Sequence, residues 1–340
     1  MNFVHLRAQT HASLKQGLMD SSDLVAKAKE NNHWAVALTE LDTLSSAVSF
    51  YTEAKKEGVK PIIGLDASIE TDLSQPDNED SVRLLLLAKN EDGYKKLMQL
   101  ITRANVENVV KTSEGDKALI KQSWLKEMDC SSLIALSGRP DSGEIPKLLT
   151  NPDYDQQELN ARLRQILPVY QSIFTDNNFF LEVARVGDAK EDLWVERMTK
   201  LSMASRIPLV ATHGVLFSER EDFFAHEVHA AITTQRSVTD PEYLPVSTRE
   251  QYYRSTEEME ELFSDLPQAL ENASLVAQMC NAKLDFGVNH LPNYPIPEGK
   301  TIEQVFVEQV NEGLQRRMEE LFPNEEERAL HMEEYQSRLN

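Results

Sequence analysis

The sequence predicts an α/β fold built on a parallel sheet of seven strands. Short apolar segments recur along the first two thirds of the chain, and most are followed by a stretch with apolar residues at helical spacing. The segment 82–88 is continuously apolar, which is typical of a strand buried on both faces in a parallel sheet. This pattern leaves open whether the sheet is open or closed into a barrel.

The first half of the chain begins with a strand at Phe3 that leads into a polar string over residues 5–13. Ser22 is suited to cap the next helix, and Gly58 is suited to end the second one. The expected elements after the first strand are, in order, a helix over 22–31, a strand over 34–39, a helix over 44–57, a strand over 61–69, an acidic loop over 71–80, a strand over 82–88 and a helix over 92–106.

The second half alternates in the same way. After a polar, exposed segment at 109–116, the expected elements are a helix over 123–128, a strand over 133–137, a helix over 155–174, a strand over 179–186, a helix over 188–205, a strand over 208–212 and helices over 218–233 and 256–279, the last broken at Pro267. Strands that alternate with helices favour right-handed crossovers in one sheet.

The chain divides, on this interpretation, into a domain over 1–280 and a second part over 281–340. Residues 291–299 contain Pro292, Pro295 and Pro297, as is typical of an extended linker. An amphipathic helix is expected over 301–322 and a charged one over 324–340. The second part has too few apolar residues for a core of its own.

Composition excludes several classes of function. The formal net charge of -21 opposes strong binding of nucleic acid by this chain. Cys130 and Cys280 stand far apart and form no metal-binding or disulfide pattern. We find no signal peptide and no apolar run that could cross a membrane, so we expect a cytoplasmic protein. Neither GxGxxG nor GxxxxGK[ST] occurs, which leaves a dinucleotide or P-loop site unsupported.

Several stretches, taken together, resemble a known family. They are FVHLRAQTHASLKQG, AVALTELDTL, VKPIIGLDASIE, LLLLAKNEDGYKKLMQLIT, LIALSG, NFFLEVARVG, PLVATHGVLF and AHEVHAAI, in order over residues 3–232. They are similar to the N-terminal polymerase and histidinol phosphatase (PHP) domain of bacterial DNA polymerase III alpha subunits. The resemblance implies a distorted seven-stranded β/α barrel of the PHP/TIM-like kind. It also implies that 281–340 lead towards a palm domain.

In metal-bearing relatives the barrel mouth holds a trinuclear cluster bound by His, Asp and Glu, and it hydrolyses phosphoesters. Here the His-x-His of the first strand reads Arg7 and Gln9, and the following acidic position is Gln16. The Asp-His pair after the second strand reads Glu40 and Leu41, the Glu of the third strand is Asp66, and the His of the fourth is Arg83. The His after the sixth strand falls near Val186, and the final Asp-x-His has Gly214 and Leu216 in place of its ligands.

Most of these side chains cannot bind a metal ion. We therefore hypothesise a metal-free mouth, without catalytic residues or a cofactor, in which Arg7 and Arg83 form ion pairs with Glu40 and Asp66. Five histidines lie in or near these stretches, and we expect them to have structural roles rather than to bind metal. His11 and His213 are expected to be exposed loop histidines, and a rearranged metal site at these two is the less favoured alternative. His226 and His229 are expected to cap or pack rather than to form a two-histidine clip, and His5 is expected to be a hydrogen-bond donor.

The leading functional hypothesis is a non-catalytic scaffold. The resemblance implies that the chain docks the proofreading 3'-5' exonuclease (epsilon) subunit and takes part in the polymerase III holoenzyme. The parent chain would be a DNA-directed DNA polymerase, a nucleotidyltransferase, but the palm motifs GxGRGSxxGS and PDxDxDF are missing from these residues. The alternative is a residual metal-dependent phosphoesterase, pyrophosphatase or exonuclease at the barrel mouth.

A metal-free mouth predicts that chelation has no effect on stability. Metals that bind only the folded state raise its melting temperature, and their removal lowers it. We expect the melting temperature measured by calorimetry to be the same with and without excess EDTA. A fall of several degrees on chelation would contradict the hypothesis.

Overall fold

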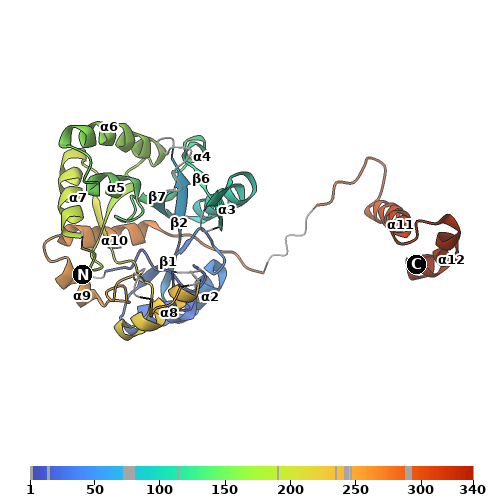
Figure 1. The fold of residues 1–340 in the computed structure, drawn as a ribbon, viewed down its shortest axis with the longest axis horizontal. Helices are drawn as coiled ribbons and strands as arrows, with labels where there is room; N and C mark the ends of the chain where they lie inside the picture. Colours follow the sequence, from blue (N-terminus) through green and yellow to red (C-terminus); the bar gives the residue numbers. More distant parts are fainter. Residues whose placement is uncertain are drawn as a thin grey trace. The chain divides into compact units, whose positions relative to one another are not determined.

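A computed structural model describes residues 3–13, 16–71, 81–112, 115–189, 191–233, 236–240, 245, 247–287 and 293–339. The chain divides into two compact units, Met1–Leu284 and Asp285–Asn340. The first unit carries the sheet and most of the helices (Figure 1). The predicted loop over 71–80 falls almost entirely on residues 72–80, outside the described residues, as does the start of the predicted linker over 291–299.

The strands are short and mostly buried. They are β1 (Ala35–Leu41), β2 (Lys60–Glu70), β3 (Val82–Ala88), β4 (Val109–Thr112), β5 (Gly115–Ala118), β6 (Ile120–Lys121), β7 (Leu133–Leu136), β8 (Phe179–Ala184) and β9 (Leu209–Thr212). The helices of the first unit are α1 (Ser21–Glu30), α2 (Ala47–Glu57), α3 (Glu91–Glu107), α4 (Gln122–Glu127), α5 (Glu144–Thr150), α6 (Gln156–Ile173), α7 (Glu191–Ser205), the 3-10 turn η1 (Arg220–Asp222), α8 (Phe223–Thr233), α9 (Thr256–Leu262) and α10 (Pro267–Met279).

The predicted α/β fold is confirmed, and its sheet is curled and mostly parallel. The main sheet has the order β1-β2-β3-β7-β8-β9, with β6 paired to β2. The expectation that residues 82–88 run parallel to their neighbours is wrong, because β3 is antiparallel to both β2 and β7. A continuous apolar run indicates that a strand is buried on both faces, but it does not indicate whether the strand runs parallel or antiparallel to its neighbours.

The N-terminal segment, residues 3–9, joins the two edges of this sheet. Its carbonyls at His5 and Ala8 accept from the β1 amides of Ala37 and Thr39. On its other side, Val215, just after β9, forms a parallel bridge with Ala8 and exchanges hydrogen bonds with Gln9 and Arg7. The predicted first strand is therefore present only as this bridge, yet it closes the barrel and brings Arg7 to its mouth.

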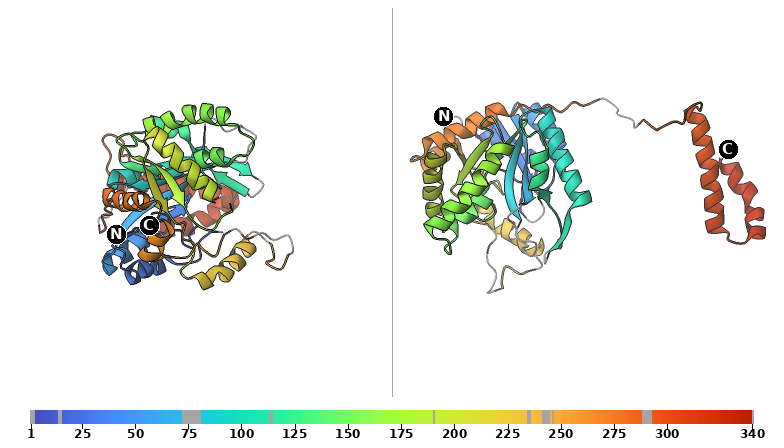
Figure 2. Two further views of the ribbon diagram at one scale, coloured as in Figure 1. Left: turned by 90° about the vertical axis from the view of Figure 1, so that its left-hand side faces the viewer. Right: turned by 90° about the horizontal axis from the view of Figure 1, so that it is seen from above.

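Helices cover the outside of the curled sheet, as the views in Figures 1 and 2 show. Gly58 ends α2 in the left-handed conformation, at φ 77°, as its position predicts. The break expected at Pro267 separates α9 from α10. The elements that were not expected include α5, the short strand β6, and a hairpin of β4 and β5 that overlaps the segment predicted to be polar and exposed. None of the described helices has both the length and the apolar character needed to cross a membrane.

The second unit is a pair of helices, α11 (Ile302–Leu321) and α12 (Glu325–Leu339), which contact each other. Val305, Leu314 and Met318 are its buried apolar side chains among the described residues. The ring of Phe322 stacks on that of His331 with centroids 4.4 Å apart.

Thr39 provides a test of barrel closure. Its buried hydroxyl accepts from the amide of Ala8 and donates to the carbonyl of Ala8, each at 3.1 Å. Replacing Thr39 by Val keeps the shape but leaves the Ala8 amide unpaired, so we expect a loss of about 1–3 kcal/mol in unfolding free energy by urea denaturation. The exposed Thr52→Val in α2 is the matched control and should change it by less than about 0.5 kcal/mol. Equal effects would show that the Thr39 hydroxyl does not hold the closing segment.

Candidate functional site

Arg7 lies at the centre of the barrel mouth. Its Nε and Nη2 donate to the two carboxylate oxygens of Glu182 at 2.7 and 2.9 Å, and its Nη1 donates to Oδ2 of Asp66 at 2.6 Å. All three side chains are at most 3% exposed. Burial opposes the charge on Arg7, but the carboxylates of Asp66 and Glu182 outweigh it and raise the pKa of Arg7 above its ordinary value.

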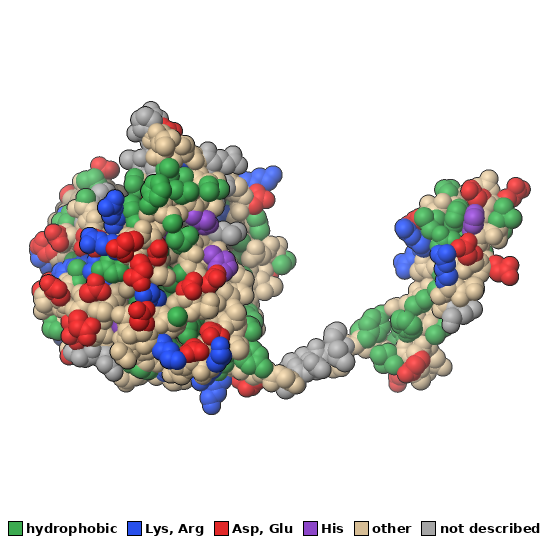
Figure 3. All heavy atoms as spheres, turned by 90° about the horizontal axis from the view of Figure 1, so that it is seen from below, with side chains coloured by type: hydrophobic (Ala, Val, Ile, Leu, Met, Phe, Trp, Pro, Cys, Tyr) green, Lys and Arg blue, Asp and Glu red, His purple; other side chains and the backbone are tan. Residues whose placement is uncertain are grey.

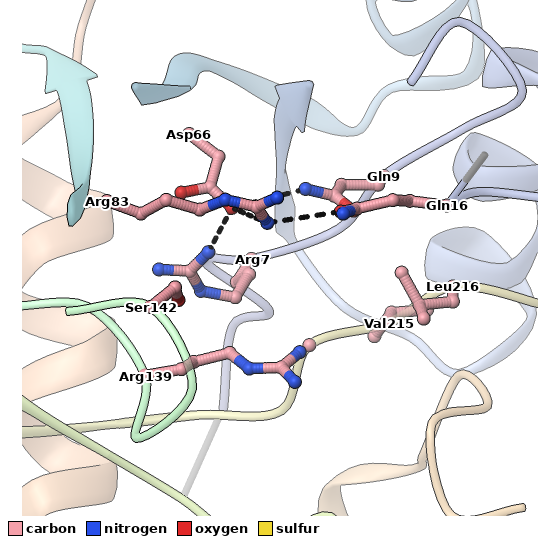
Figure 4. Close-up of a pocket in the computed structure, with 10 residues that line it drawn as sticks. Arg7, Gln9, Gln16, Asp66, Arg83, Arg139, Ser142, Val215 and Leu216 are labelled. Atoms are coloured by element: carbon pink, nitrogen blue, oxygen red, sulfur yellow. Dashed lines mark hydrogen bonds and ion pairs between the residues drawn. The ribbon is translucent and has the colours of Figure 1, made fainter. Parts of the chain in front are cut away.

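A chain of polar side chains extends this arrangement towards solvent. Gln9 donates to Oδ2 of Asp66 at 3.2 Å. With its amide oxygen towards Arg83, Gln16 accepts from Nη2 of Arg83 at 3.0 Å and donates to Oε1 of Gln9 at 2.7 Å. Nη1 of Arg83 also lies 3.8 Å from Oδ2 of Asp66. Figure 4 shows these side chains converging from the N-terminal segment, β2 and β3.

The mouth is nearly filled by its own side chains. The cavity left between them measures about 10 Å³, roughly the space of one water-sized sphere. Seven of the predicted positions line it: Arg7, Gln9, Gln16, Asp66, Arg83, Gly214 and Leu216. Arg139, Ser142 and Val215 complete the lining. The structure thus brings together most of the residues that the sequence singled out.

Glu40 does not line this cavity, and the prediction that it pairs with the arginines is wrong. Its carboxylate accepts from the amide and hydroxyl of Thr10 and from the hydroxyls of Ser13 and Ser46. These donors lie on the loop after the N-terminal segment and at the start of α2. Hydroxyls brought close in space, from the loop after the N-terminal segment and from the start of α2, therefore satisfy the buried charge of Glu40, and no arginine is required.

Glu182 is the functional residue that the sequence analysis missed. It lies on β8 with no exposed surface and accepts from Thr212 on β9 at 2.7 Å as well as from Arg7. The available signal was a single carboxylate in the otherwise apolar run Phe179–Ala184. A buried charge in a strand requires a partner, and the structure supplies Arg7 from the N-terminal segment. Val186, where the family pattern places a ligand, lies outside the mouth cluster, and its amide donates to Glu191.

The metal ions that the fold family implies do not fit this donor set. The carboxylate oxygens of Glu182 and Oδ2 of Asp66 are occupied by a fixed guanidinium, whose positive charge opposes a cation at the same place. The other carboxylate oxygen of Asp66, Oδ1, is buried and has no hydrogen-bond partner among the residues that the structure describes. Those described residues also contain no group of three or more His, Cys, Asp or Glu side chains arranged to hold a metal.

A larger cleft opens beside the mouth and shares Gln16 and Arg83 with it. Its volume is about 700 Å³, within the range of small-molecule sites. Leu41 lines this cleft and does not line the mouth cavity. The remaining lining includes the cationic Lys117 and the acidic Asp116 on β5, so charges of both signs face the space.

The histidines have mainly structural partners. Nε2 of His5 donates to the carbonyl of Arg254 at 2.8 Å, and Nε2 of His213 donates to the carbonyl of Glu250 at 2.6 Å. His213 is buried and does not match the exposed loop position expected for it. Burial, followed by the nearby charge of Arg254, lowers the pKa of His213 to about 3. His11 is exposed and lies 2.6 Å from Asp20.

Comparison with known proteins identifies related sequences. The family model of the PHP domain matches residues 5–186. DNA polymerase III subunit alpha of Vibrio cholerae is 37% identical over 337 residues, and that of Haemophilus influenzae is 35% identical over 337 residues. Each alignment covers 99% of this chain and 28% of the relative. Among solved structures, an amidohydrolase from Chromobacterium violaceum aligns with a TM-score of 0.41 and 13% identity over 63% of this chain and 86% of that chain, a similarity too low to support a conclusion.

Replacing Arg7 tests the central ion pairs. Arg7→Met leaves the buried Glu182 without its guanidinium partner and Asp66 with only the more distant Arg83, so we expect the unfolding free energy to fall by about 3–5 kcal/mol in denaturant titrations. Lys200→Met removes an exposed pair with Glu196 and should cost less than about 1 kcal/mol. A loss below about 1 kcal/mol for Arg7→Met would show that these carboxylates do not depend on Arg7.

His213 makes stability depend on pH. Its pKa is about 3 when folded, and an unfolded histidine has a pKa of about 6.5, so between these values the unfolded chain binds the extra proton and stability falls as pH falls. Between pH 6 and 4, the unfolding free energy of the natural chain should fall more steeply than that of His213→Gln, by about 1.4 kcal/mol per pH unit. Parallel curves for the two proteins would show that His213 is not the titrating group.

Proposed function

The chain belongs to the PHP-domain family, and from this membership we propose that it is the non-catalytic scaffold region of a DNA polymerase III alpha subunit. It spans about 28% of the length of the curated relatives that it matches. The activity of the whole polymerase is therefore not assigned to these residues. We propose a place for the region in the polymerase III holoenzyme.

The proposal that the region is non-catalytic depends on one observation. The guanidinium of Arg7 forms ion pairs with the carboxylates of both Glu182 and Asp66. Metal-dependent phosphoester hydrolysis needs cations that generate hydroxide and stabilise the attacking and leaving oxygens. A guanidinium supplies fixed positive charge but cannot carry a reactive water as a ligand. The nearly filled mouth also leaves little room for a substrate phosphate.

The proposed partner is the proofreading 3'-5' exonuclease subunit. A replicative polymerase without hydrolytic ligands in its PHP domain needs proofreading from a separate protein. A folded barrel next to the polymerase can hold such a protein in place without chemistry of its own. The net charge of -21 also favours a protein partner over direct binding of DNA.

A residual phosphoesterase, pyrophosphatase or exonuclease is the second candidate. It is favoured by the free Oδ1 of Asp66 and by the cleft of about 700 Å³ beside the mouth. It would require Arg7 to turn away from both carboxylates, which the burial of all three side chains opposes.

Binding and hydrolysis measured on the full 340-residue chain distinguish these candidates. We expect the purified exonuclease subunit to bind with a Kd of about 10 μM or tighter by isothermal titration calorimetry. We expect no release of phosphate from phosphoesters or pyrophosphate with added Mn²⁺ or Zn²⁺. Metal-dependent release that is lost in Asp66→Asn would favour the enzyme, and the absence of binding at these concentrations would contradict the scaffold.

A further inference from the structure

We propose that the outer face of helix α8 is the surface on which the exonuclease subunit docks, through a segment whose apolar residues are followed by lysine or arginine. This inference rests on the proposed function and names the surface that would perform it. It follows from an exposed apolar stripe, from the way the helix is fixed beneath, and from the charges beside it.

The stripe consists of Phe224, Val228 and Ile232. They are four residues apart and therefore lie along one side of the helix. Phe224 is 68% exposed and Ile232 is 69% exposed, while Val228 is partly buried. Figure 3 shows hydrophobic side chains gathered over this part of the larger unit. Large apolar side chains grouped on one exposed helix face are typical of a surface that a partner covers.

The opposite face of α8 is fixed to the barrel by buried polar contacts. Nε2 of His226 donates to the carbonyl of Gln16 at 2.5 Å, and Ser247 contacts both Nδ1 of His226 and the carboxylate of Glu227, at 3.1 and 3.0 Å. His226 and Glu227 are at most 4% exposed. The helix is thus already held in position before any partner binds, which reduces the entropy lost on binding.

The charge beside the stripe indicates the chemistry of the partner. Glu219, Glu221 and Asp222 come directly before or within the turn that leads into α8, and Glu221 is exposed. Arg220 of the same turn is paired with Glu250, and Glu219 is paired with Lys27, so the acidic character beside the stripe comes from Glu221 and Asp222. Acidic side chains predominate over basic ones on the same face in Figure 3. Arg236, after the end of the helix, is exposed and has the opposite sign. A segment whose basic residues lie over Glu221 and Asp222 therefore matches this surface in charge as well as in apolar contact.

A second copy of the chain is a weaker candidate for the same surface. Two molecules of net charge -21 repel each other, and both would bring acidic residues to the contact. The remainder of a longer polymerase chain is the other competitor. In the experiment below, a second copy would show as a dimer in sedimentation. A surface used only by the remainder of the chain would leave exonuclease binding unchanged in the α8 variants.

The test uses the full chain and purified exonuclease subunit in isothermal titration calorimetry. The double variant Phe224→Ser/Ile232→Ser should weaken binding at least about tenfold. The double variant Val106→Ser/Met203→Ser is the matched control, because these side chains are 78% and 77% exposed on other helices, and it should bind like the natural chain. Glu221→Lys should weaken binding about threefold and reduce its dependence on salt.

Each result bears on the proposal. If the natural chain binds and the α8 variants bind equally well, this inference fails while the proposed function stands. If the natural chain does not bind, both fail. Equal losses in the α8 and control variants would also overturn the surface, as would sedimentation showing a dimer of the natural chain that only the α8 variants dissociate. Melting temperatures confirm that each variant is folded, and Glu221→Lys tests the surface without changing an apolar residue.

Discussion

The ion pairs of one buried arginine determine the character of the barrel mouth. Arg7 comes from the N-terminal segment, Asp66 from β2 and Glu182 from β8, so a single guanidinium joins distant parts of the chain. None of these charges is tolerable in the interior without the others. Thr212 and Gln9 take up further carboxylate lone pairs and fix the directions of both partners. The mouth therefore holds a permanent positive charge where the family resemblance implies metal ions, and its carboxylates serve stability.

Much of the fold could be predicted from the sequence, because the spacing of apolar residues and the positions of glycine and proline are local signals. The helix ending at Gly58 and the break at Pro267 follow from backbone geometry that those residues impose. The direction of β3 could not be predicted, since an apolar run is the same in either direction. The pairing of Arg7 with Asp66 was expected, but Glu182 was not, because its importance depends on a contact 175 residues away in the chain. The partners predicted for Glu40 were wrong because its carboxylate accepts from the hydroxyls of Thr10, Ser13 and Ser46, and hydroxyl side chains are weak signals in a sequence.

Gln16 connects the mouth to the outer surface of the barrel. Its side chain lies between Gln9 and Arg83, and its carbonyl accepts from His226 on α8. The helix that carries the exposed apolar stripe is therefore held by the same loop that completes the polar mouth. The proposed scaffold still needs this polar interior, because the loops around it position the outer helices. On this view, the mouth contributes to function through the shape of the surface that it supports.

In the barrel mouth, the guanidinium charge of Arg7 lies where the family resemblance implies metal ions. The most direct measurement is a crystal structure of the chain grown with excess Zn²⁺ or Mn²⁺, with anomalous diffraction recorded at the absorption edge of the metal. The account predicts no anomalous peak in the mouth, with Arg7 forked between Glu182 and Asp66. An anomalous peak within bonding distance of Asp66 and Glu182, with Arg7 turned away, would contradict it.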